Sequence, residues 1–448
     1  MVKLLMIADD FTGALDTGIQ FVKKGIKTQV FTEQIIEEKD IKADVEVLVV
    51  DTESRPMNAQ EAGRVVGRLT KWAVNHGIQM IFKKTDSALR GNIGAELEAA
   101  SVASGRTLYF LPAYPEIGRI TKEGIHYIDG ELLENSVFGM DPFEPVTQSY
   151  IPDIIREQSG ILVKCIGTEE EIPQEDTPGI TVCDAVSEED IDRRVDELIR
   201  EGKTGLVAGC AALACRFAEK LSFRRFEAKE FYQTKRLFVA CGSLNRITEE
   251  QVDYAEQRGG FLRLHLTMEQ KLLKDYFETE KGKRFLQEIV FLCRQSRKMI
   301  VDTFDTTETK KTFLQEHQIR EDQVRGLIAG AHGRIVKEIM EKEPDVTVLL
   351  TGGDTLMGYM KLIGCKQLEP VCEIEPGVVV SSLELDGRSR QVISKSGGFG
   401  EQDILCRIAL KILKMEKGGL HTDEKHRVKR DYYSDFNSNE RRREYQYR

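Results

Sequence analysis

Short apolar runs alternate with longer segments of helical periodicity through the first half of the chain, and this alternation constrains the fold more than any other feature. The apolar runs predict strands at residues 2–8, 28–32, 46–51, 79–84, 107–112, 159–166, 180–184 and 204–209. The helical patterns lie at residues 12–24, 58–76, 92–104, 188–201 and 211–221. Such alternation is typical of a mostly parallel sheet covered by helices, so we expect an α/β fold.

A charged stretch at residues 223–236 precedes a second alternating series. Strands are predicted at residues 237–242, 261–265, 299–302, 346–351 and 391–396, and helices at 248–259, 283–296, 321–340, 355–362 and 402–415. We therefore expect two domains, residues 1–230 and 231–415, each with a mostly parallel sheet flanked by helices. Residues 416–448 lack apolar periodicity and are predicted to form a charged, disordered tail.

Charge and cysteine usage narrow the class of protein. The net charge of −10 argues against a nucleic-acid partner. The nine cysteines are scattered without a CxxC pair, which favours reduced, packed thiols. The first apolar run, residues 4–8, is too short for a signal sequence, and no run approaches the roughly 18 apolar residues of a membrane span. We expect a cytoplasmic protein with no membrane partner, and the sequence leaves open whether it forms a homodimer.

The common nucleotide-binding signatures are absent. Residues 202–204 read Gly-Lys-Thr, but Glu197 stands where a Walker A loop needs its first glycine, and the tripeptide precedes a strand. No Gly-x-Gly-x-x-Gly follows the first strand, which argues against a standard nicotinamide or flavin fold. Candidate chemistry must therefore come from other clusters at strand ends, where open α/β sheets bind their ligands.

The first such cluster is Asp9 and Asp10, at the end of the first predicted strand. A carboxylate there could accept a proton from a substrate hydroxyl or orient a metal. The alternative is that Asp10 or Thr12 only caps the following helix. Two adjacent carboxylates at the end of a buried strand cost desolvation, which keeps the functional interpretation open.

The second cluster follows the strand at residues 79–84 and holds Lys83, Lys84, Asp86 and Arg90. These charges could bind a small carboxylate, with Arg90 able to do so bidentately. The alternative is a solvated turn in which Asp86 pairs with Arg90. Arg55, after the strand at residues 46–51, could reach the same site or lie in a surface turn, and His126 in a turn-rich stretch is expected to be structural.

Three glycine-rich turns mark the second series, at residues 241–245, 351–355 and 395–400. Glycine lets the backbone approach an oxyanion, and a helix N-terminus adds amide donors. Each turn alone could be an ordinary one, but three in one domain favour a phosphate cradle.

Several of these segments together resemble the four-carbon acid sugar kinase family, whose members phosphorylate threonate, erythronate and their oxo relatives. The residues that carry the resemblance are 9–14, 84–92, 118–130, 141–145, 351–355 and 395–400, in family order over about residues 1–414. The resemblance implies an N-terminal domain that holds the sugar acid, a C-terminal domain that binds ATP, and transfer across the cleft between them.

The resemblance also assigns residues by motif. The substrate site would be lined by Asp9, Asp10, Arg55, Lys84, Asp86, Ser87 and Arg90. The nucleotide would be held by Ser243, Gly352, Gly353, Asp354, Thr355, Gly397 and Gly398. Four departures from the family pattern concern substrate identity more than reaction type: Ala88 replaces a usual threonine, Leu244-Asn245 a usual serine, Gly398 a usual asparagine, and residues 329–333 are irregular.

The resulting hypothesis is ATP-dependent phosphorylation of the terminal (4-)hydroxyl of a short sugar acid. Lys84 and Arg90 would hold the substrate carboxylate, and Asp10, with Asp86 second, would accept the hydroxyl proton. Mg²⁺ would bridge the phosphates, with ligands that the sequence does not identify. Two other classes stay open: a non-catalytic sugar-acid or nucleotide sensor, and an atypical NAD(P)-dependent hydroxy-acid dehydrogenase.

Overall fold

A computed structural model describes residues 1–140, 145–174, 177–227, 229–243, 245–304, 307–385 and 387–414. It divides into two compact units, which confirms the expected two-domain α/β class. The first comprises residues 1–231 and 363–396, and the second residues 232–362 together with the chain from residue 397. The predicted tail at 416–448, residues 141–144 of the family resemblance, and Leu244 lie outside the described residues.

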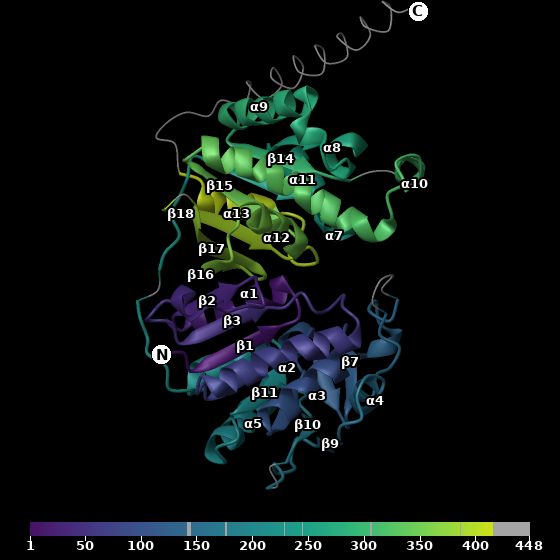
Figure 1. Ribbon diagram of the computed structural model, residues 1–448, viewed down its shortest axis with the longest axis vertical. Helices are drawn as coiled ribbons and strands as arrows, with labels where there is room; N and C mark the ends of the chain where they lie inside the picture. Colours follow the sequence, from purple (N-terminus) through teal and green to yellow (C-terminus); the bar gives the residue numbers. More distant parts are fainter. Residues whose placement is uncertain are drawn as a thin grey trace, which may run out of the picture. The chain divides into compact units, whose positions relative to one another are not determined.

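The first unit is built on one large sheet in the order β18-β17-β16-β2-β3-β1-β4-β11-β5-β10-β9 (Figure 1). Its parallel strands are β1 (Leu4–Ala8), β2 (Thr28–Phe31), β3 (Val47–Asp51), β4 (Met80–Lys84), β5 (Thr107–Leu111), β9 (Val163–Ile166), β10 (Gly179–Cys183) and β11 (Leu206–Gly209). Three antiparallel strands extend it, β16 (Gln367–Glu375), β17 (Val378–Leu385) and β18 (Arg388–Lys395). A small antiparallel sheet contains β6 (Arg119–Lys122), β7 (Ile125–Ile128) and β8 (Glu131–Leu132).

Helices cover both faces of this sheet. They are α1 (Phe11–Lys23), α2 (Ala59–Asn75), α3 (Ile93–Ser104), α4 (Ile151–Arg156), α5 (Glu188–Arg200) and α6 (Ala211–Lys220). On one face, Leu5 and Ile81 of the sheet join a buried apolar cluster with residues of α2 and α3. On the other face, the rings of Phe82 and Phe217 meet edge to face at 6.3 Å. The residues of the central strands are therefore buried on both sides, as expected for parallel strands.

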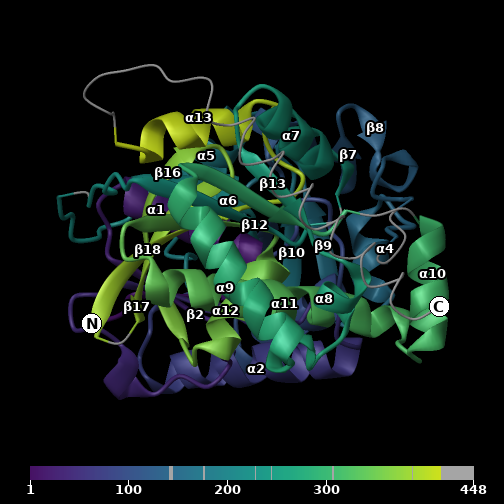
Figure 2. The same cartoon turned by 90° about the horizontal axis from the view of Figure 1, so that it is seen from above.

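The second unit contributes four parallel strands in the order β13-β14-β12-β15. Its strands are β12 (Arg236–Cys241), β13 (Leu262–His265), β14 (Lys298–Asp302) and β15 (Val346–Thr351). Its helices are α7 (Arg246–Gln257), α8 (Met268–Leu272), α9 (Glu280–Gln295), α10 (Thr307–Glu316), α11 (Glu321–Lys342), α12 (Gly353–Leu362) and α13 (Ile404–Ile412). Within this unit α11 and α12 lie side by side (Figure 2).

The expected division into residues 1–230 and 231–415 differs from the observed grouping in one segment, residues 363–396. These residues form β16, β17 and β18, and β16 joins the first unit because Leu368 pairs with Val30 of β2. The sequence pattern predicts a strand only at residues 391–396 of this segment. A pairing across more than 300 residues of chain leaves no local signal in either strand.

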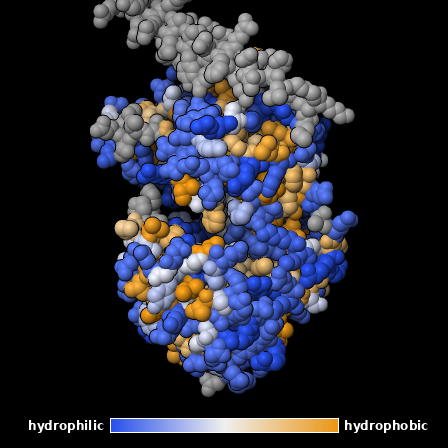
Figure 3. Space-filling view, turned by 180° about the vertical axis from the view of Figure 1, so that it is seen from behind, coloured by the Kyte–Doolittle hydropathy of each residue, from blue (hydrophilic) through white to orange (hydrophobic). Residues whose placement is uncertain are grey.

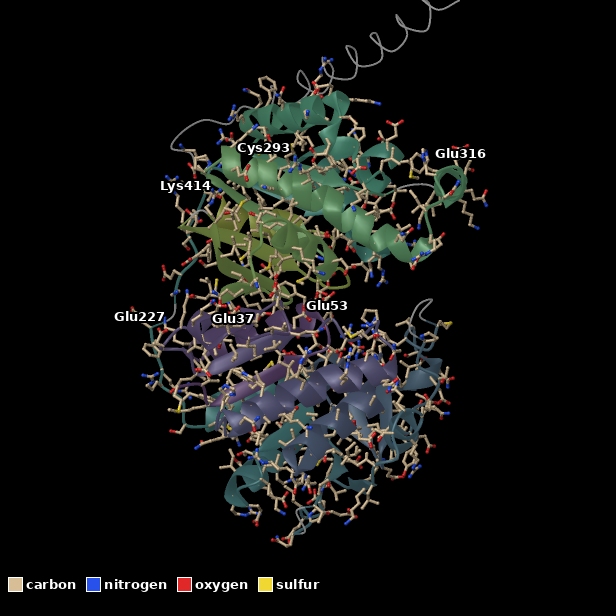
Figure 4. The ribbon with its side chains drawn as sticks, in the orientation of Figure 1. Glu37, Glu53, Glu227, Cys293, Glu316 and Lys414 are labelled. Atoms are coloured by element: carbon tan, nitrogen blue, oxygen red, sulfur yellow. The ribbon has the colours of Figure 1, made fainter. Side chains whose placement is uncertain are left out.

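The cysteines agree with the expectation of free thiols. All nine cysteines are free thiols, and none falls among the fully exposed residues. Cys293 on α9, labelled in Figure 4, is buried, and this burial raises the pKa of its thiol to about 12. Hydrophilic residues predominate on the face drawn in Figure 3. Each helix in the described part of the chain is too short or too polar to cross a membrane.

Candidate active site

Both units present polar loops at the carboxyl ends of their parallel strands. In the first unit Ala8 at the end of β1 is in register with Asp51 of β3 and Lys84 of β4. After β1 the chain leads toward β2 and β3 on one side, and it later reaches β4 on the other side. The order thus reverses around β1, and such a switch point is where open α/β sheets bind ligands.

Arg55, in the loop after β3, connects the carboxylates of two other loops. Its Nε lies 2.7 Å from Asp9 Oδ2, and its Nη2 lies 2.9 Å from Asp10 Oδ1 and 3.8 Å from Asp86 Oδ1. Burial alone would lower the pKa of Arg55, but these three carboxylates outweigh it and raise the pKa well above its usual value. Arg55 therefore lies in the charged cluster and not in a surface turn.

Asp10 caps helix α1 and also belongs to this cluster. Its Oδ1 accepts a hydrogen bond of 3.0 Å from the Gly13 amide and contacts Arg55. An ideal Cβ added to Gly13 would lie 2.5 Å from Asp10 Oδ1 and 2.9 Å from Lys84 Nζ, so both charged groups stand close to this glycine. The capping and functional interpretations of Asp10 are therefore compatible.

Asp86 and Arg90 form a bidentate ion pair. Arg90 Nε lies 2.7 Å from Asp86 Oδ2, and Arg90 Nη2 lies 3.1 Å from Asp86 Oδ1. Burial would raise the pKa of Asp86, but Arg55 and Arg90 hold it far below its usual value. A carboxylate with so low a pKa is a weak proton acceptor, which favours Asp10 over Asp86 as the base.

The two adjacent lysines at the end of β4 have different environments, because successive side chains of a strand point to opposite faces of the sheet. Lys84 is buried near Asp10, and its Nζ donates to the Thr85 carbonyl at 2.7 Å. Lys83 is fully buried, and its Nζ lies 2.8 Å from Glu96 Oε2 on helix α3. Lys84 is thus among the charges at the strand ends, whereas Lys83 forms a buried ion pair.

Ser87 is held through its backbone. Its carbonyl accepts a 3.0 Å hydrogen bond from His126 Nε2, while His126 Nδ1 lies 3.0 Å from Thr121 Oγ1. These contacts favour a neutral imidazole with the proton on Nε2 and the Thr121 hydroxyl donating to Nδ1. Burial lowers the pKa of His126 to about 4. The expected structural role of His126 agrees with this environment.

His126 predicts a pH dependence of stability. Its pKa is about 4 when folded and near 6.5 when unfolded, so acid protonates the unfolded chain first. Each such histidine makes the free energy of unfolding rise with pH by up to about 1.4 kcal/mol per unit between these values. We expect His126→Gln to reduce this slope. Urea titrations from pH 4.5 to 7, followed by fluorescence of Trp72 in the first unit, would measure it, and equal slopes would contradict the assignment.

Other polar groups near this cluster were not anticipated from the sequence. Asp16 on α1 has a pKa raised to about 6 by burial, with Lys84 opposing the shift and Glu373 of β16 adding to it. Arg119, at the start of β6, lies near Asp86 and Arg90. Arg119 follows Gly118 in a turn after β5, which marks it as a candidate polar residue. The sequence around it does not indicate where its side chain points.

In the second unit, the three glycine-rich turns converge. An ideal Cβ on Gly397 would lie 2.7 Å from Ser243 Oγ, and one on Gly352 would lie 3.9 Å from Ser243 Cβ. Gly352 has a φ of +87°, which favours glycine there. The Thr248 hydroxyl donates to the Gly397 carbonyl at 2.6 Å and ties the turn at residues 395–400 to helix α7. Three chain segments that are far apart in sequence thus meet at one place.

The remaining predicted nucleotide residues occupy different positions around this meeting point. Gly353 and Asp354 begin helix α12, and Asp354 is exposed. Thr355 is buried, and its hydroxyl donates to the Thr351 carbonyl at 2.9 Å, so its side chain supports the turn from inside. Gly398 is exposed, and a Cβ there would meet Asn245 Nδ2 at 3.9 Å.

A further polar group at the strand ends of this unit was missed by sequence analysis. Asp302 closes β14 and accepts from Arg263 Nε at 2.6 Å and from His265 Nδ1 at 2.7 Å. Beside it Lys271 donates to the Thr303 carbonyl at 3.0 Å, and burial lowers the pKa of Lys271 to about 8. These residues lie on separate strands and on α8, so no motif joins them in the sequence.

Comparisons with known proteins agree with both units. The family model of a sugar-binding N-terminal domain matches residues 4–217, and that of a nucleotide-binding C-terminal domain matches residues 238–405. A D-threonate kinase of Salmonella typhimurium is 31% identical over 427 residues, which cover 90% of this chain and 97% of the relative. The chain belongs to the four-carbon acid sugar kinase family. This membership confirms the resemblance seen in the sequence and makes the chain a phosphotransferase.

Other relatives of the kinase differ in the acid they are named for. A D-erythronate kinase of Heliobacterium modesticaldum is 24% identical and covers 91% of this chain and 96% of its own length. A 3-oxo-tetronate kinase of Pseudomonas fluorescens is 24% identical, with coverages of 90% and 95%. A crystal structure of a Salmonella typhimurium protein is 21% identical and covers 92% of this kinase and 100% of its own chain with a TM-score of 0.76, which supports the fold.

Proposed function

We propose that the kinase uses ATP to phosphorylate the terminal hydroxyl of a four-carbon sugar acid such as D-threonate, D-erythronate or 3-oxo-tetronate. Relatives named for these three acids each align with at least 90% of the chain. The first unit, matched by the sugar-binding family model, would hold the acid, and the second would hold the nucleotide. The 31% identical relative is a D-threonate kinase, so D-threonate is the first substrate to test.

The observation that carries this proposal is that Asp10 is partly exposed and has one carboxylate oxygen available for a hydrogen bond. Its side chain is 28% exposed, whereas those of Asp9 and Asp86 are 3% and 12% exposed. Both the Gly13 amide and Arg55 contact Oδ1, and Oδ2 has no hydrogen-bond partner among the described residues. Oδ2 can therefore receive the proton of a substrate hydroxyl without breaking an existing contact.

The chemical step transfers the γ-phosphoryl group of ATP to the acid. The terminal hydroxyl oxygen of the acid forms a bond to the γ-phosphorus of ATP while its proton moves to Asp10 Oδ2. The bond between the γ-phosphorus and the β–γ bridging oxygen breaks, and ADP leaves with that electron pair. Such transfer asks the protein mainly to align the two substrates and to offset charge. Lys84, close to Asp10, would offset charge on the acceptor side.

The meeting point of Ser243, Gly352 and Gly397 suits the phosphates of the nucleotide. A Cβ at Gly397 would fill the space next to Ser243 Oγ, so glycine keeps that space open to a ligand. Gly352 immediately precedes helix α12, whose first amides can donate to a phosphate. We assign to this nucleotide site the residues that the sequence predicted, including Gly353, Asp354, Thr355 and Gly398. Thr355 is buried and would support the turn through its hydrogen bond to the Thr351 carbonyl.

Mg²⁺ would be the metal of such a reaction, in which it would offset the charge of the phosphates. In the described part of the chain no three His, Cys, Asp or Glu side chains gather into a metal-binding group. Mg²⁺ in kinase sites keeps several waters and takes few protein ligands. A metal held chiefly by the nucleotide would need no such group of side chains.

An ADP-release assay tests the proposal. The full-length kinase would be incubated with ATP, Mg²⁺ and, in turn, D-threonate, D-erythronate, 3-oxo-tetronate and their stereoisomers. We expect acid-dependent ADP formation with a turnover in the usual enzymatic range, about 1–10³ s⁻¹, for one acid. Phosphorus NMR of that product should place the phosphate on the terminal oxygen. Tight acid binding without ADP formation would instead identify a sensor.

A further inference from the structure

Arg119 occupies a fixed position beside the charged cluster of the first unit. It begins β6, and its backbone exchanges hydrogen bonds of 2.7 and 3.0 Å with Tyr114, which follows β5. The guanidinium carbon of Arg119 lies 5.2 Å from the ring centre of Phe138, and that of Arg90 lies 5.1 Å from the same ring centre. Both guanidinium groups thus contact the ring of Phe138.

The charges of these two arginines are compensated differently. Arg90 is held bidentately by Asp86. Arg119 has one carboxylate in ion-pair range among the described residues, Asp129, at 3.6 Å with a side chain that is 77% exposed. Such an exposed pair is worth little in water. Arg119 itself is only 15% exposed, so its charge is partly desolvated without a close counter-ion.

The donors of Arg119 show the same incomplete pairing. Its Nη1 donates to the Ile117 carbonyl at 3.2 Å, while its Nε is buried with no hydrogen-bond partner in the described structure. Burial lowers the pKa of Arg119, and neither Asp129 nor Asp86 restores it, whereas the pKa of Arg55 is raised by its three carboxylates. Arginine donors that are buried and unpaired are costly unless a ligand satisfies them.

We propose that Arg119, whose guanidinium lies against the ring of Phe138, binds the carboxylate of the sugar acid. An anionic group there would supply the counter-charge that Arg119 lacks, and a planar guanidinium fork matches a planar carboxylate. Arg90, already paired with Asp86, would contribute mainly to the local positive potential. This inference rests on the proposed function and names the residue that recognises the acid end of its substrate.

The test compares substrates with and without the carboxylate. Wild-type kinase and Arg119→Met would be assayed with D-threonate and with threitol, the corresponding four-carbon polyol. Hydrogen bonds to charged groups account for about a tenfold to a hundredfold change in affinity. We expect Arg119→Met to raise the KM for D-threonate by that factor, with kcat and the KM for ATP within twofold. The kcat/KM for threitol should change less than twofold.

Two further variants guard against a folding artefact. Arg119→Lys keeps the charge but loses the fork, and we expect a KM between those of wild type and Arg119→Met. Arg156→Met removes an exposed arginine of α4, paired with Asp153 at 2.6 Å, and should leave both substrates unaffected. An equal loss for D-threonate and threitol, or an unchanged KM for D-threonate, would overturn the assignment.

Calorimetric titration of D-threonate without nucleotide separates this inference from the proposed function. Weaker binding in Arg119→Met than in wild type supports the assignment even if no ADP is formed, in which case the kinase proposal alone fails. Equal binding in a wild type and variant that both turn over refutes Arg119 as the carboxylate ligand and leaves the kinase proposal standing. If wild type neither binds nor phosphorylates any tested acid, both fail.

Discussion

Asp10→Asn is expected to lower kcat by about 10²–10⁴-fold, the usual contribution of a positioned general base. The amide cannot take up the hydroxyl proton, yet Asn has the same shape. Asparagine is also a good helix N-cap, so its Oδ1 can still accept from the Gly13 amide and helix α1 should keep its start. The KM for ATP should change little, because Asp10 belongs to the first unit and the nucleotide is assigned to the second.

Asp86→Asn is the matched comparison for Asp10→Asn, since both change one carboxylate bound to Arg55. Asp86 is paired with Arg90 and has a strongly lowered pKa, so its loss should disturb the cluster and raise the KM for the acid more than it lowers kcat. Single-turnover measurements with saturating ATP and acid would separate the two effects. Near-normal turnover in Asp10→Asn, with a deep loss of kcat in Asp86→Asn, would transfer the base to Asp86.

The gathering of charged loops at the strand ends of the first unit was predictable from sequence. Parallel strands in register bring their following loops to one edge of the sheet, and the strands before Asp9, Arg55 and Lys84 were visible as apolar runs. What the sequence left open was the pairing inside the cluster. The local context of Arg55 is equally consistent with a surface turn, and only the register of β1 and β3 brings it to Asp9 and Asp10.

Residues whose partners come from other elements could not be assigned in advance. Lys83 adjoins the cations of the site in the sequence, but in the structure it pairs with Glu96 because α3 packs on that face of β4. Arg119 and Phe138 meet through the small antiparallel sheet and the chain that follows it, where turn residues obscure the strand pattern. Long-range packing decides such contacts, and no short motif records it.

Lys83→Met is expected to lower the free energy of unfolding by about 3–5 kcal/mol, the range for breaking a buried ion pair. Lys83 and Glu96 are almost completely buried, with 2.8 Å between Nζ and Oε2. Removing the ammonium leaves the carboxylate of Glu96 with the Ser54 hydroxyl, which donates to Oε1 at 2.5 Å, but without a counter-charge. Urea unfolding followed by the single tryptophan, Trp72 on α2, would report on the first unit.

The double variant Lys83→Met/Glu96→Gln decides why stability is lost. If the uncompensated carboxylate is the cause, neutralising it should recover most of the lost free energy, because burying two charges is itself costly and neutral groups of similar size avoid that cost. A Gln at position 96 can still accept from the Ser54 hydroxyl. The double variant should also keep the wild-type KM for the sugar acid, since Lys83 faces α3 and not the strand-end loops. No recovery in the double variant would instead mean that the contacts of the Lys83 side chain, including its donation to the Lys84 carbonyl at 2.5 Å, hold β4 in place by themselves.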